Sequence, residues 1–201
     1  MGLPLTRQHF TPEEYLAWEV LQPDKHEYIG GEVFAMAGGE DRHASVALNV
    51  AMALREHLRG TPCRVYMADV RVQTDEAFFY PDVFVTCSNA DAQDRLRKRE
   101  PSLIVEVLSP STAAYDAGAK FAHYRAIASL QEYLLIDIER RSADLFRKTA
   151  DGLWMLHPFT LANTLQLSSV DLHLAVTAVF ADLEEDAPAD PALPPATATQ
   201  N

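Results

Sequence analysis

The sequence predicts an α/β fold in a single main domain. Apolar residues recur at helical spacing between residues 43 and 58, so one face of a helix is predicted to be buried there. Several short runs rich in β-branched and aromatic residues follow, and each is bounded by polar or turn-forming residues. The chain has 201 residues, of which 48% are hydrophobic, so it can bury a sizeable core.

The N-terminal part predicts a short helix, a hairpin and the first core helix. Residues 11–14 read Thr-Pro-Glu-Glu, which is typical of a helix start, and this helix is expected to run to about Glu19. Residues 28–36 contain Gly30-Gly31, a turn signal between two strands. The core helix is expected from His43 to Leu58.

The central part predicts three strands followed by a helix and one more strand. The predicted strands are residues 64–73, 80–87 and 103–108, with a polar connection over residues 91–100. A helix is expected from about Tyr115 to Ala128. The strongly apolar run from Glu132 to Asp137 predicts an internal strand.

The C-terminal part predicts a second hairpin and a disordered tail. Residues 141–147 and 153–159 are expected to pair across Asp151-Gly152, and a short helix is expected near residues 172–181. The last residues are rich in Ala, Pro and acids and cannot bury enough surface to become ordered. We therefore expect one domain over residues 1–182 and a tail over residues 183–201.

Two acidic residues stand in strand-like segments near the middle of the chain. Side chains alternate along a strand, so Glu106 points away from the side of its apolar neighbours Val105 and Val107. An acid in an otherwise apolar strand is costly unless it has a partner. Asp82 follows Pro81 at the start of another strand, and two neighbouring strands with one carboxylate each would suit a hard cation such as Mg²⁺.

A lysine in the following helix could reach these acids. Asp116, Lys120 and Tyr124 are spaced four apart and share one helix face. Lys120 could act in chemistry beside the two acids or form a buried salt bridge with one of them. Asp116 could hold Lys120 in place or form an ordinary surface pair, and Tyr124 is more typical of a core aromatic residue than of a reactant.

The motifs around these residues resemble a known family. The segments are HEYIGGEVFAMAG at 26–38, HASVALNVAMAL at 43–54, YPDVFV at 80–85, PSLIVEVLSPST at 101–112, DAGAKFAHYR at 116–125 and QEYLLID at 131–137. In this order they resemble the Uma-type branch of restriction endonucleases in the PD-(D/E)XK nuclease superfamily. The resemblance implies an α/β fold with a restriction-endonuclease-like core (helix, three strands, helix, strand), an N-terminal helix and hairpin, and a C-terminal hairpin.

The resemblance also implies a metal-dependent nuclease site. Asp82, Glu106 and the backbone carbonyl of Val107 would hold Mg²⁺ (or Mn²⁺), and Lys120 would assist the attack of water on a DNA phosphodiester. The superfamily pattern ends in Lys two residues after the second acid, where this chain has Leu108. In the Uma-type branch the amine comes from the following helix, and Lys120 is the matching residue.

Further supporting residues follow from the same resemblance. Glu27 and Glu32 match acidic positions of the family, and Glu32 is preferred as an extra ligand because it follows the hairpin turn. His43 becomes a candidate for contact with phosphate or with the site. From the residues alone, the two glutamates would be solvated hairpin acids and His43 a polar residue at a helix start.

The charge favours a different class of function. A formal net charge of −12 argues against a broad nucleic-acid-binding face, because phosphate contacts require Lys and Arg. The basic group Arg95, Arg97, Lys98 and Arg99 could contact a phosphate backbone or form a solvated loop. The alternative function is therefore a non-catalytic nuclease-like module that binds nucleic acid or a protein partner, which Leu108 also favours.

Other features bear on location and assembly. No apolar stretch reaches the roughly 18 residues of a membrane span, and the N-terminus lacks the apolar core of a signal peptide. Cys63 and Cys87 are not expected to form a close pair or a zinc site, which favours a reducing cytoplasm. We therefore expect a cytoplasmic protein with no membrane partner, and the resemblance implies a homodimer that cuts two strands with two symmetric sites.

Overall fold

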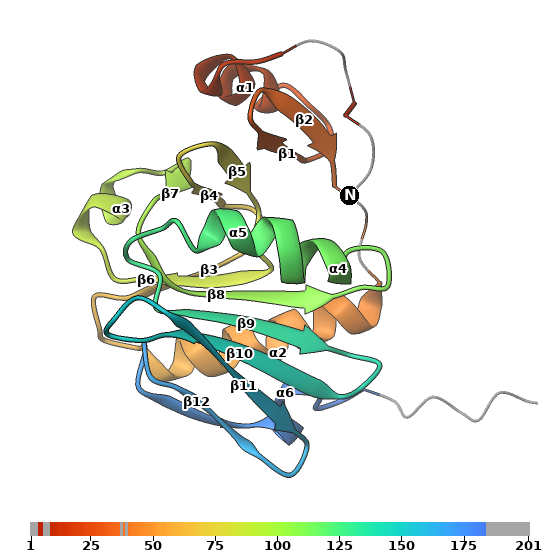
Figure 1. The fold of residues 1–201 in the computed structure, drawn as a ribbon, viewed down its shortest axis with the longest axis vertical. Coiled ribbons are helices and arrows are strands. Elements are labelled where there is room, and N and C mark those ends of the chain that lie inside the picture. Colours follow the sequence, from red (N-terminus) through yellow and green to blue (C-terminus); the bar gives the residue numbers. More distant parts are fainter. Residues whose placement is uncertain (1–3, 6–8, 37, 39, 184–201) are drawn as a thin grey trace, which may run out of the picture.

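A six-stranded sheet forms the centre of the protein in a computed structural model that describes residues 4–5, 9–36, 38 and 40–183 (Figure 1). Its strands are β3 (Arg64–Met67), β6 (Val83–Thr86), β8 (Pro101–Leu108), β9 (Glu132–Asp137), β10 (Ser142–Lys148) and β11 (Trp154–Thr160). They lie in the order β11-β10-β9-β8-β6-β3. β8 and β9 run parallel, whereas the other neighbours are antiparallel. The predicted internal position of Glu132–Asp137 is confirmed.

One face of this sheet packs on the long helix α2 (Asp41–His57). The hairpin of β12 (Thr164–Leu167) and β13 (Leu172–Ala175), followed by α6 (Val176–Val179), closes the same side. Alternate strand residues such as Leu103, Val105 and Leu134 point into this core and are fully buried. The apolar face that the sequence predicts for residues 43–58 therefore covers the sheet.

The other face of the sheet is covered by a broken helix. It consists of α4 (Ala113–Tyr115), a π-helical turn η1 (Asp116–Lys120) and α5 (Phe121–Tyr124). Phe121 stacks on Tyr133 with 4.7 Å between ring centroids, and Ile104 of β8 belongs to the same apolar cluster. Glu106 shares the strand face of Ile104, so it points toward this broken helix rather than toward α2.

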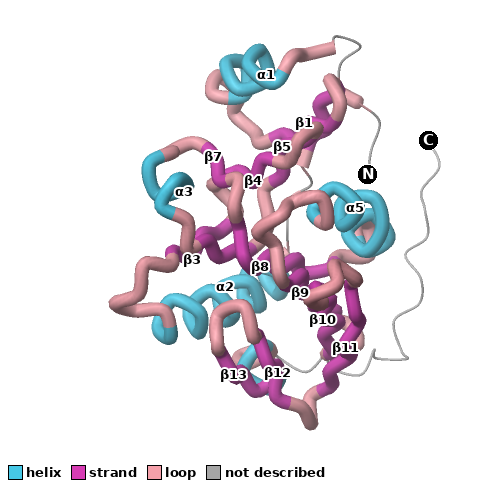
Figure 2. Tube along the Cα trace, turned by 60° about the vertical axis from the view of Figure 1, so that its left-hand side comes forward, coloured by secondary structure: helices cyan, strands magenta, loops and turns pink. Residues whose placement is uncertain are grey.

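A second, smaller sheet lies above the broken helix (Figures 1 and 2). Its strands are β1 (His26–Ile29), β2 (Glu32–Ala35), β4 (Arg71–Gln73), β5 (Ala77–Phe79) and β7 (Arg97–Lys98), in the order β2-β1-β5-β4-β7. Helix α1 (Pro12–Glu19) packs on it through Tyr15, which stacks on Tyr28. A further short helix, α3 (Asn89–Gln93), leads toward β7.

The two N-terminal predictions are confirmed in atomic detail. Thr11 and Glu14 form a reciprocal capping box at the start of α1. Gly30 and Gly31 have φ angles of +55° and +99°, as a tight hairpin turn between β1 and β2 requires. A Cβ atom on Gly31 would lie 2.7 Å from His9 Nδ1, and the φ angle of +99° would strain any residue with a side chain.

Other predicted elements were wrong in part. The strand expected over residues 64–73 is divided between two sheets, because a turn at residues 68–70 ends β3. Strand β5 and the short β7 were not expected, since they are too brief to show a periodic pattern. The helix expected near residues 172–181 begins as β13, in which Leu172 and Leu174 alternate with exposed residues.

The cysteines differ from the expectation. Cys63 and Cys87 form a disulfide that closes a separation of 24 residues. Cys63 directly precedes β3 and Cys87 directly follows β6, and the register of these antiparallel strands places Arg64 opposite Thr86. The sequence separation alone does not reveal this pairing, so the prediction of two unpaired cysteines was wrong.

The ends of the described chain leave two expectations open. Leu183, the first residue of the predicted tail, packs against the main core, and residues 184–201 lie outside the described residues. The two-part division of the chain therefore stays a prediction. Across the described ranges, no helix combines the length and apolar character that crossing a membrane would require.

Candidate active site

Asp82 and Glu106 meet at one end of the central sheet. The antiparallel register of β6 and β8 pairs Val83 with Val105, which brings the preceding Asp82 beside Glu106. The Asp82 backbone N–H donates to Glu106 Oε2 at 3.4 Å, and Asp82 Oδ2 accepts a hydrogen bond from the Val107 N–H at 2.7 Å. The structure thus brings together the two acids that the sequence singled out.

Lys120 extends into the same cluster from the end of the π-helical turn. Its Nζ lies 2.9 Å from Glu106 Oε1, 3.0 Å from Glu27 Oε1 and 3.7 Å from Asp116 Oδ1. The residue is only 6% exposed, so these contacts are made largely away from water. The face shared by Asp116 and Lys120 is preserved, although the turn between them is π-helical rather than α-helical.

Two buried tyrosines hold the cluster in place. The Tyr124 hydroxyl donates to Glu106 Oε1 at 2.9 Å, and the Tyr133 hydroxyl donates to the Asp116 carbonyl at 3.0 Å. Sequence reasoning treated Tyr124 as a core aromatic residue. Its spacing four residues after Lys120 was the available signal that it shares the face directed at the acids.

His43 joins the cluster from the first turn of α2. Its Nε2 lies 3.2 Å from Asp82 Oδ2. The hydrogen bond to Asp82 raises the pKa of His43, and the Val107 backbone adds to the effect. The expectation that His43 contacts the site therefore agrees with its position.

The hairpin supplies Glu27 instead of the preferred Glu32. Glu27 lies on β1, is 8% exposed and contacts Lys120. Glu32 begins β2 beside the turn and is half-buried, and it does not line the cleft described below. Glu32 pairs with Ile29 in the hairpin register, which leaves it at the turn end while Glu27 lies deeper along the strand. The structure therefore places Glu27 rather than Glu32 in the cluster, and the ligand role preferred for Glu32 stays a prediction that this position does not favour.

The cluster is rich in buried carboxyl groups. Burial raises the pKa of Glu106 to about 8, although Lys120 acts to lower it. Burial also raises the pKa of Asp116. For Lys120, burial acts to lower the pKa, but Glu106, Glu27 and Asp116 outweigh it and raise the pKa well above the usual value. The ammonium group therefore stays charged at neutral pH.

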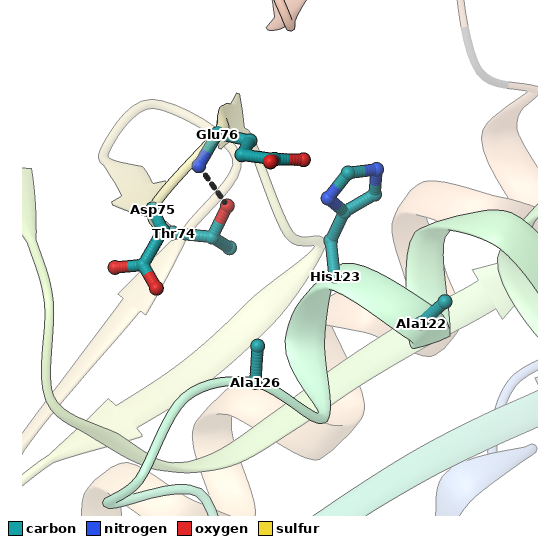
Figure 3. A pocket seen from close by; sticks show the side chains of 6 residues that line it. All are labelled: Thr74, Asp75, Glu76, Ala122, His123 and Ala126. Atoms are coloured by element: carbon teal, nitrogen blue, oxygen red, sulfur yellow. Dashed lines mark hydrogen bonds between the residues drawn. The ribbon is translucent and has the colours of Figure 1, made fainter.

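These side chains line a cleft of about 940 Å³. Its lining includes Glu27, His43, Asp82, Glu106, Asp116 and Lys120. A second, smaller pocket of about 360 Å³ lies between residues 74–76 and His123 of α5 (Figure 3). The smaller pocket contains none of the predicted site residues.

Comparison with known proteins shows the family to which the chain that carries this site belongs. Residues 12–178 match the Uma2 family, which is described as "Putative restriction endonuclease". The chain belongs to the Uma2 family. Two relatives from Synechocystis sp., described as uncharacterized proteins slr1290 and sll1609, are 38% and 35% identical over 175 and 160 residues. The first alignment covers 86% of this chain and 92% of slr1290, and the second covers 78% of this chain and 90% of sll1609.

A solved structure shares the fold of this Uma2 protein. It is described as a crystal structure of "a putative nuclease belonging to DUF820" from Anabaena variabilis. The TM-score is 0.71 at 17% sequence identity, and the match covers 85% of this chain and 97% of the other. The α/β, restriction-endonuclease-like fold expected from the sequence is confirmed. The family supports a nuclease function in general terms.

Leu108, which stands where the superfamily pattern has a lysine, makes apolar contacts in this Uma2 protein. Leu108 ends β8, pairs with Asp137 of β9 and packs against the cluster that contains Phe121. It shares the strand face of Glu106. Lys120 places its amine 2.9 Å from the Glu106 carboxylate from the helix side instead.

The basic segment is mostly structural. Lys98 is 3% exposed, and its Nζ donates to the backbone carbonyls of Asp91, at 2.6 Å, and Asp94. Arg97 pairs with Asp94 at 3.2 Å. Of the four basic residues only Arg95 and Arg99 are exposed, so the segment offers less charge to a phosphate backbone than its sequence suggests.

Proposed function

We propose that this Uma2 protein is a Mg²⁺- or Mn²⁺-dependent endonuclease that hydrolyses DNA phosphodiester bonds. The observation that carries the proposal is the cluster of Asp82, Glu106 and Lys120 at one end of the central sheet, inside a cleft. The family description supports the same class of reaction. The proposal includes a homodimer, in which two copies of the site would act on two strands. The cytoplasmic location stays an expectation, and the Cys63–Cys87 disulfide removes the argument that unpaired cysteines gave for it.

The donor chemistry of the cleft suits a hard divalent cation. Asp82 and Glu106 offer carboxylate oxygens, and from the described residues Glu106 Oε2 accepts one long hydrogen bond, from the Asp82 N–H. Among the described residues, no three His, Cys, Asp or Glu side chains are grouped so as to hold a metal ion by themselves. The proposed set therefore adds the Val107 carbonyl to two carboxylates, and Mg²⁺ commonly completes such a set with water and substrate oxygens.

The balance of charge also favours a cation. The carboxyl groups of Glu27, Asp82, Glu106 and Asp116 line the cleft, and Lys120 contacts three of them. Lys25, which also lines the cleft, is paired with Asp69. A bound divalent cation would offset this excess, polarise the phosphate and make water a stronger nucleophile. The protein's contribution is to fix the carboxylates through the Val107 N–H and the Tyr124 hydroxyl.

Lys120 is proposed to stabilise negative charge that develops on the phosphate. Its raised pKa keeps the ammonium protonated, so it donates hydrogen bonds rather than accepting a proton from water. Its Nζ is already oriented by Glu27 and Glu106 at 3.0 and 2.9 Å. This orientation reduces the reorganisation that the reaction would otherwise require.

A non-catalytic binding module is the competing function. The observation that favours it is the charge: the chain carries −12 overall, and Lys98 and Arg97 are already paired inside the protein. Such a module would bind its partner without a cation and without turnover.

The deciding experiment is a cleavage assay on labelled DNA with Mg²⁺, Mn²⁺ or EDTA. Asp82→Ala and Glu106→Ala are each expected to abolish cleavage. Asp82→Ala should retain the fold, because removing one of two clustered carboxylates relieves repulsion, whereas Glu106→Ala also removes a buried partner of Lys120 and should lower the melting temperature. Asp144→Ala, which removes an exposed acid from β10, is the matched control and should cleave normally. Cleavage that persists in EDTA or in either site variant would sink the metal assignment.

A further inference from the structure

Tyr115 carries a hydroxyl group that the described protein leaves without a partner. The residue ends α4, directly before the π-helical turn, and it lines the cleft. Its side chain is half-buried, but the hydroxyl oxygen itself is buried and has no hydrogen-bond partner. A buried hydroxyl that makes no hydrogen bond is costly, whereas a phenylalanine of the same shape would avoid that cost.

Within the described residues, none of the acids around Tyr115 accepts a hydrogen bond from its hydroxyl. Burial raises the pKa of the Tyr115 hydroxyl, and Glu27, Asp116 and Glu106 all lie close enough to raise it further. Glu27 Oε1 is held by Lys120, and Glu106 Oε1 is held by Lys120 and Tyr124. The hydroxyl is therefore a free donor placed among the residues proposed for the reaction.

A ligand in the cleft would meet this donor. Tyr115 lines the cleft and is half-buried, so a rotation of its side chain that turned the hydroxyl toward the cleft would let it reach a ligand there. An anionic phosphate oxygen bound in the cleft could accept a hydrogen bond from the Tyr115 hydroxyl, and it would lie beside the Lys120 ammonium. A hydrogen bond from a hydroxyl to a charged oxygen is stronger than one between neutral groups.

We propose that the Tyr115 hydroxyl donates a hydrogen bond to a non-bridging oxygen of the phosphate group bound in the cleft, beside Lys120. Tyr115 is then a further catalytic residue, since it contacts the reacting group. The inference rests on the proposed nuclease function for its role in turnover, but phosphate recognition by this hydroxyl can be measured separately.

The test compares wild type with Tyr115→Phe, which removes the oxygen and keeps the ring. The control is Tyr66→Phe, since Tyr66 is a half-buried tyrosine of β3 outside the cleft. Three quantities are measured for each protein: the melting temperature, the rate of cleavage of a labelled oligodeoxynucleotide, and the affinity for inorganic phosphate in the presence of Mg²⁺ by calorimetry.

We expect Tyr115→Phe to keep or raise the melting temperature, because the unpaired oxygen is gone. Its kcat for cleavage should fall about 10- to 100-fold, and its phosphate affinity should fall by about the same factor or less. Tyr66→Phe should match wild type in kcat and in phosphate affinity. A purely structural role for Tyr115 would instead lower the melting temperature and leave phosphate affinity unchanged.

The outcomes separate this inference from the proposed function. If wild type cleaves DNA and Tyr115→Phe cleaves equally well, the inference is overturned and the nuclease proposal stands. If wild type binds phosphate through Tyr115 but cleaves no nucleic acid, the nuclease proposal fails and phosphate recognition is retained. A wild type that neither cleaves nor binds phosphate overturns both.

Discussion

At the scale of single residues, the cleft combines groups that sequence reasoning finds with groups that it does not find. Asp82 and Glu106 could be found because each is an acid beside apolar strand residues, and that arrangement requires a partner. Glu27 and Tyr124 could not be assigned in the same way, since their contacts depend on how a separate sheet and a helix face meet the central sheet. The spacing of Tyr124 from Lys120 indicates a shared helix face, but it does not show that this face meets Glu106.

The Lys120 ammonium has a predicted double role, in stability and in cleavage. Lys120→Ala leaves buried acids without their counter-charge, and breaking a buried ion pair costs about 3–5 kcal/mol of unfolding free energy. We expect a lower melting temperature and cleavage slowed by at least about 100-fold, the size of an effect from removing one charge-stabilising donor. Mg²⁺ affinity should be retained. Chemical denaturation, metal titration and single-turnover kinetics measure these three quantities.

Two further variants sharpen the result for Lys120. Lys120→Arg keeps the charge but should restore little activity, because a planar guanidinium cannot occupy the place of a compact ammonium between Glu27 and Glu106. Lys148→Ala removes a half-buried lysine of β10 that lies outside the cleft, and it serves as the control. Full cleavage by Lys120→Ala in a metal-dependent assay would reject the catalytic role and leave Lys120 as a structural partner of the acids.

At the scale of elements, regular patterns were predicted well and irregular ones were not. The core helix, the two hairpins and strand β9 follow from periodicity and turn residues. The helix expected over residues 115–128 is broken by the π-helical turn of Asp116–Lys120, which no propensity scale marks. That turn includes Lys120 and is held by the Tyr133 hydroxyl, so the departure coincides with the site.

Glycine substitutions test whether the π-helical turn has room for a stiffer backbone. Gly118 lies inside this turn, and an added Cβ there would contact nothing within 4 Å. Gly118→Ala should raise the unfolding free energy by up to about 1 kcal/mol, because glycine loses more backbone entropy on folding. Gly31→Ala is the opposite case, with φ +99° and a 2.7 Å contact to His9, and should lower it by about 1–3 kcal/mol. Thermal and urea unfolding of both variants give the two signs, and a destabilised Gly118→Ala would contradict the open position.

The disulfide predicts a measurable link between two strands. Cys63–Cys87 ties the edge strand β3 to β6 across 24 residues, and closing a loop of this size is worth about 3 kcal/mol in the chain-entropy description. The double variant Cys63→Ala/Cys87→Ala should lose about that much unfolding free energy in denaturant. Wild type in dithiothreitol should behave like the variant, and the variant itself should not respond to dithiothreitol. Two titratable thiols in the unreduced wild type would contradict the bond.

At the scale of the whole molecule, the site depends on the assembly of both sheets. Asp82 and Glu106 come from the central sheet, whereas Glu27 comes from the smaller sheet that α1 covers. Tyr80, which stands two residues before Asp82 in the chain, connects the two regions. Its hydroxyl donates a hydrogen bond to Glu19 Oε1 at 2.8 Å. The net charge of the whole molecule is the main difficulty for a nuclease function, because DNA, a polyanion, must approach a chain of net charge −12.

The C-terminal residues supply a direct test of that difficulty. Residues 184–201 contain four acids and no Lys or Arg, so a chain that ends at Leu183 has a formal net charge of −8 instead of −12. At low ionic strength the truncated chain should cleave DNA a few-fold faster, because long-range repulsion slows the approach of DNA to the full chain. At physiological salt the difference should vanish, since charges separated by more than about 8 Å are then screened. A full-length variant with the four acids changed to Gln or Asn keeps the length and should match the truncated chain if charge is the cause. Equal rates for all three chains at low salt would mean that the tail's charge does not govern access to the cleft, and unfolding of the truncated chain would mean that the tail contributes to the fold.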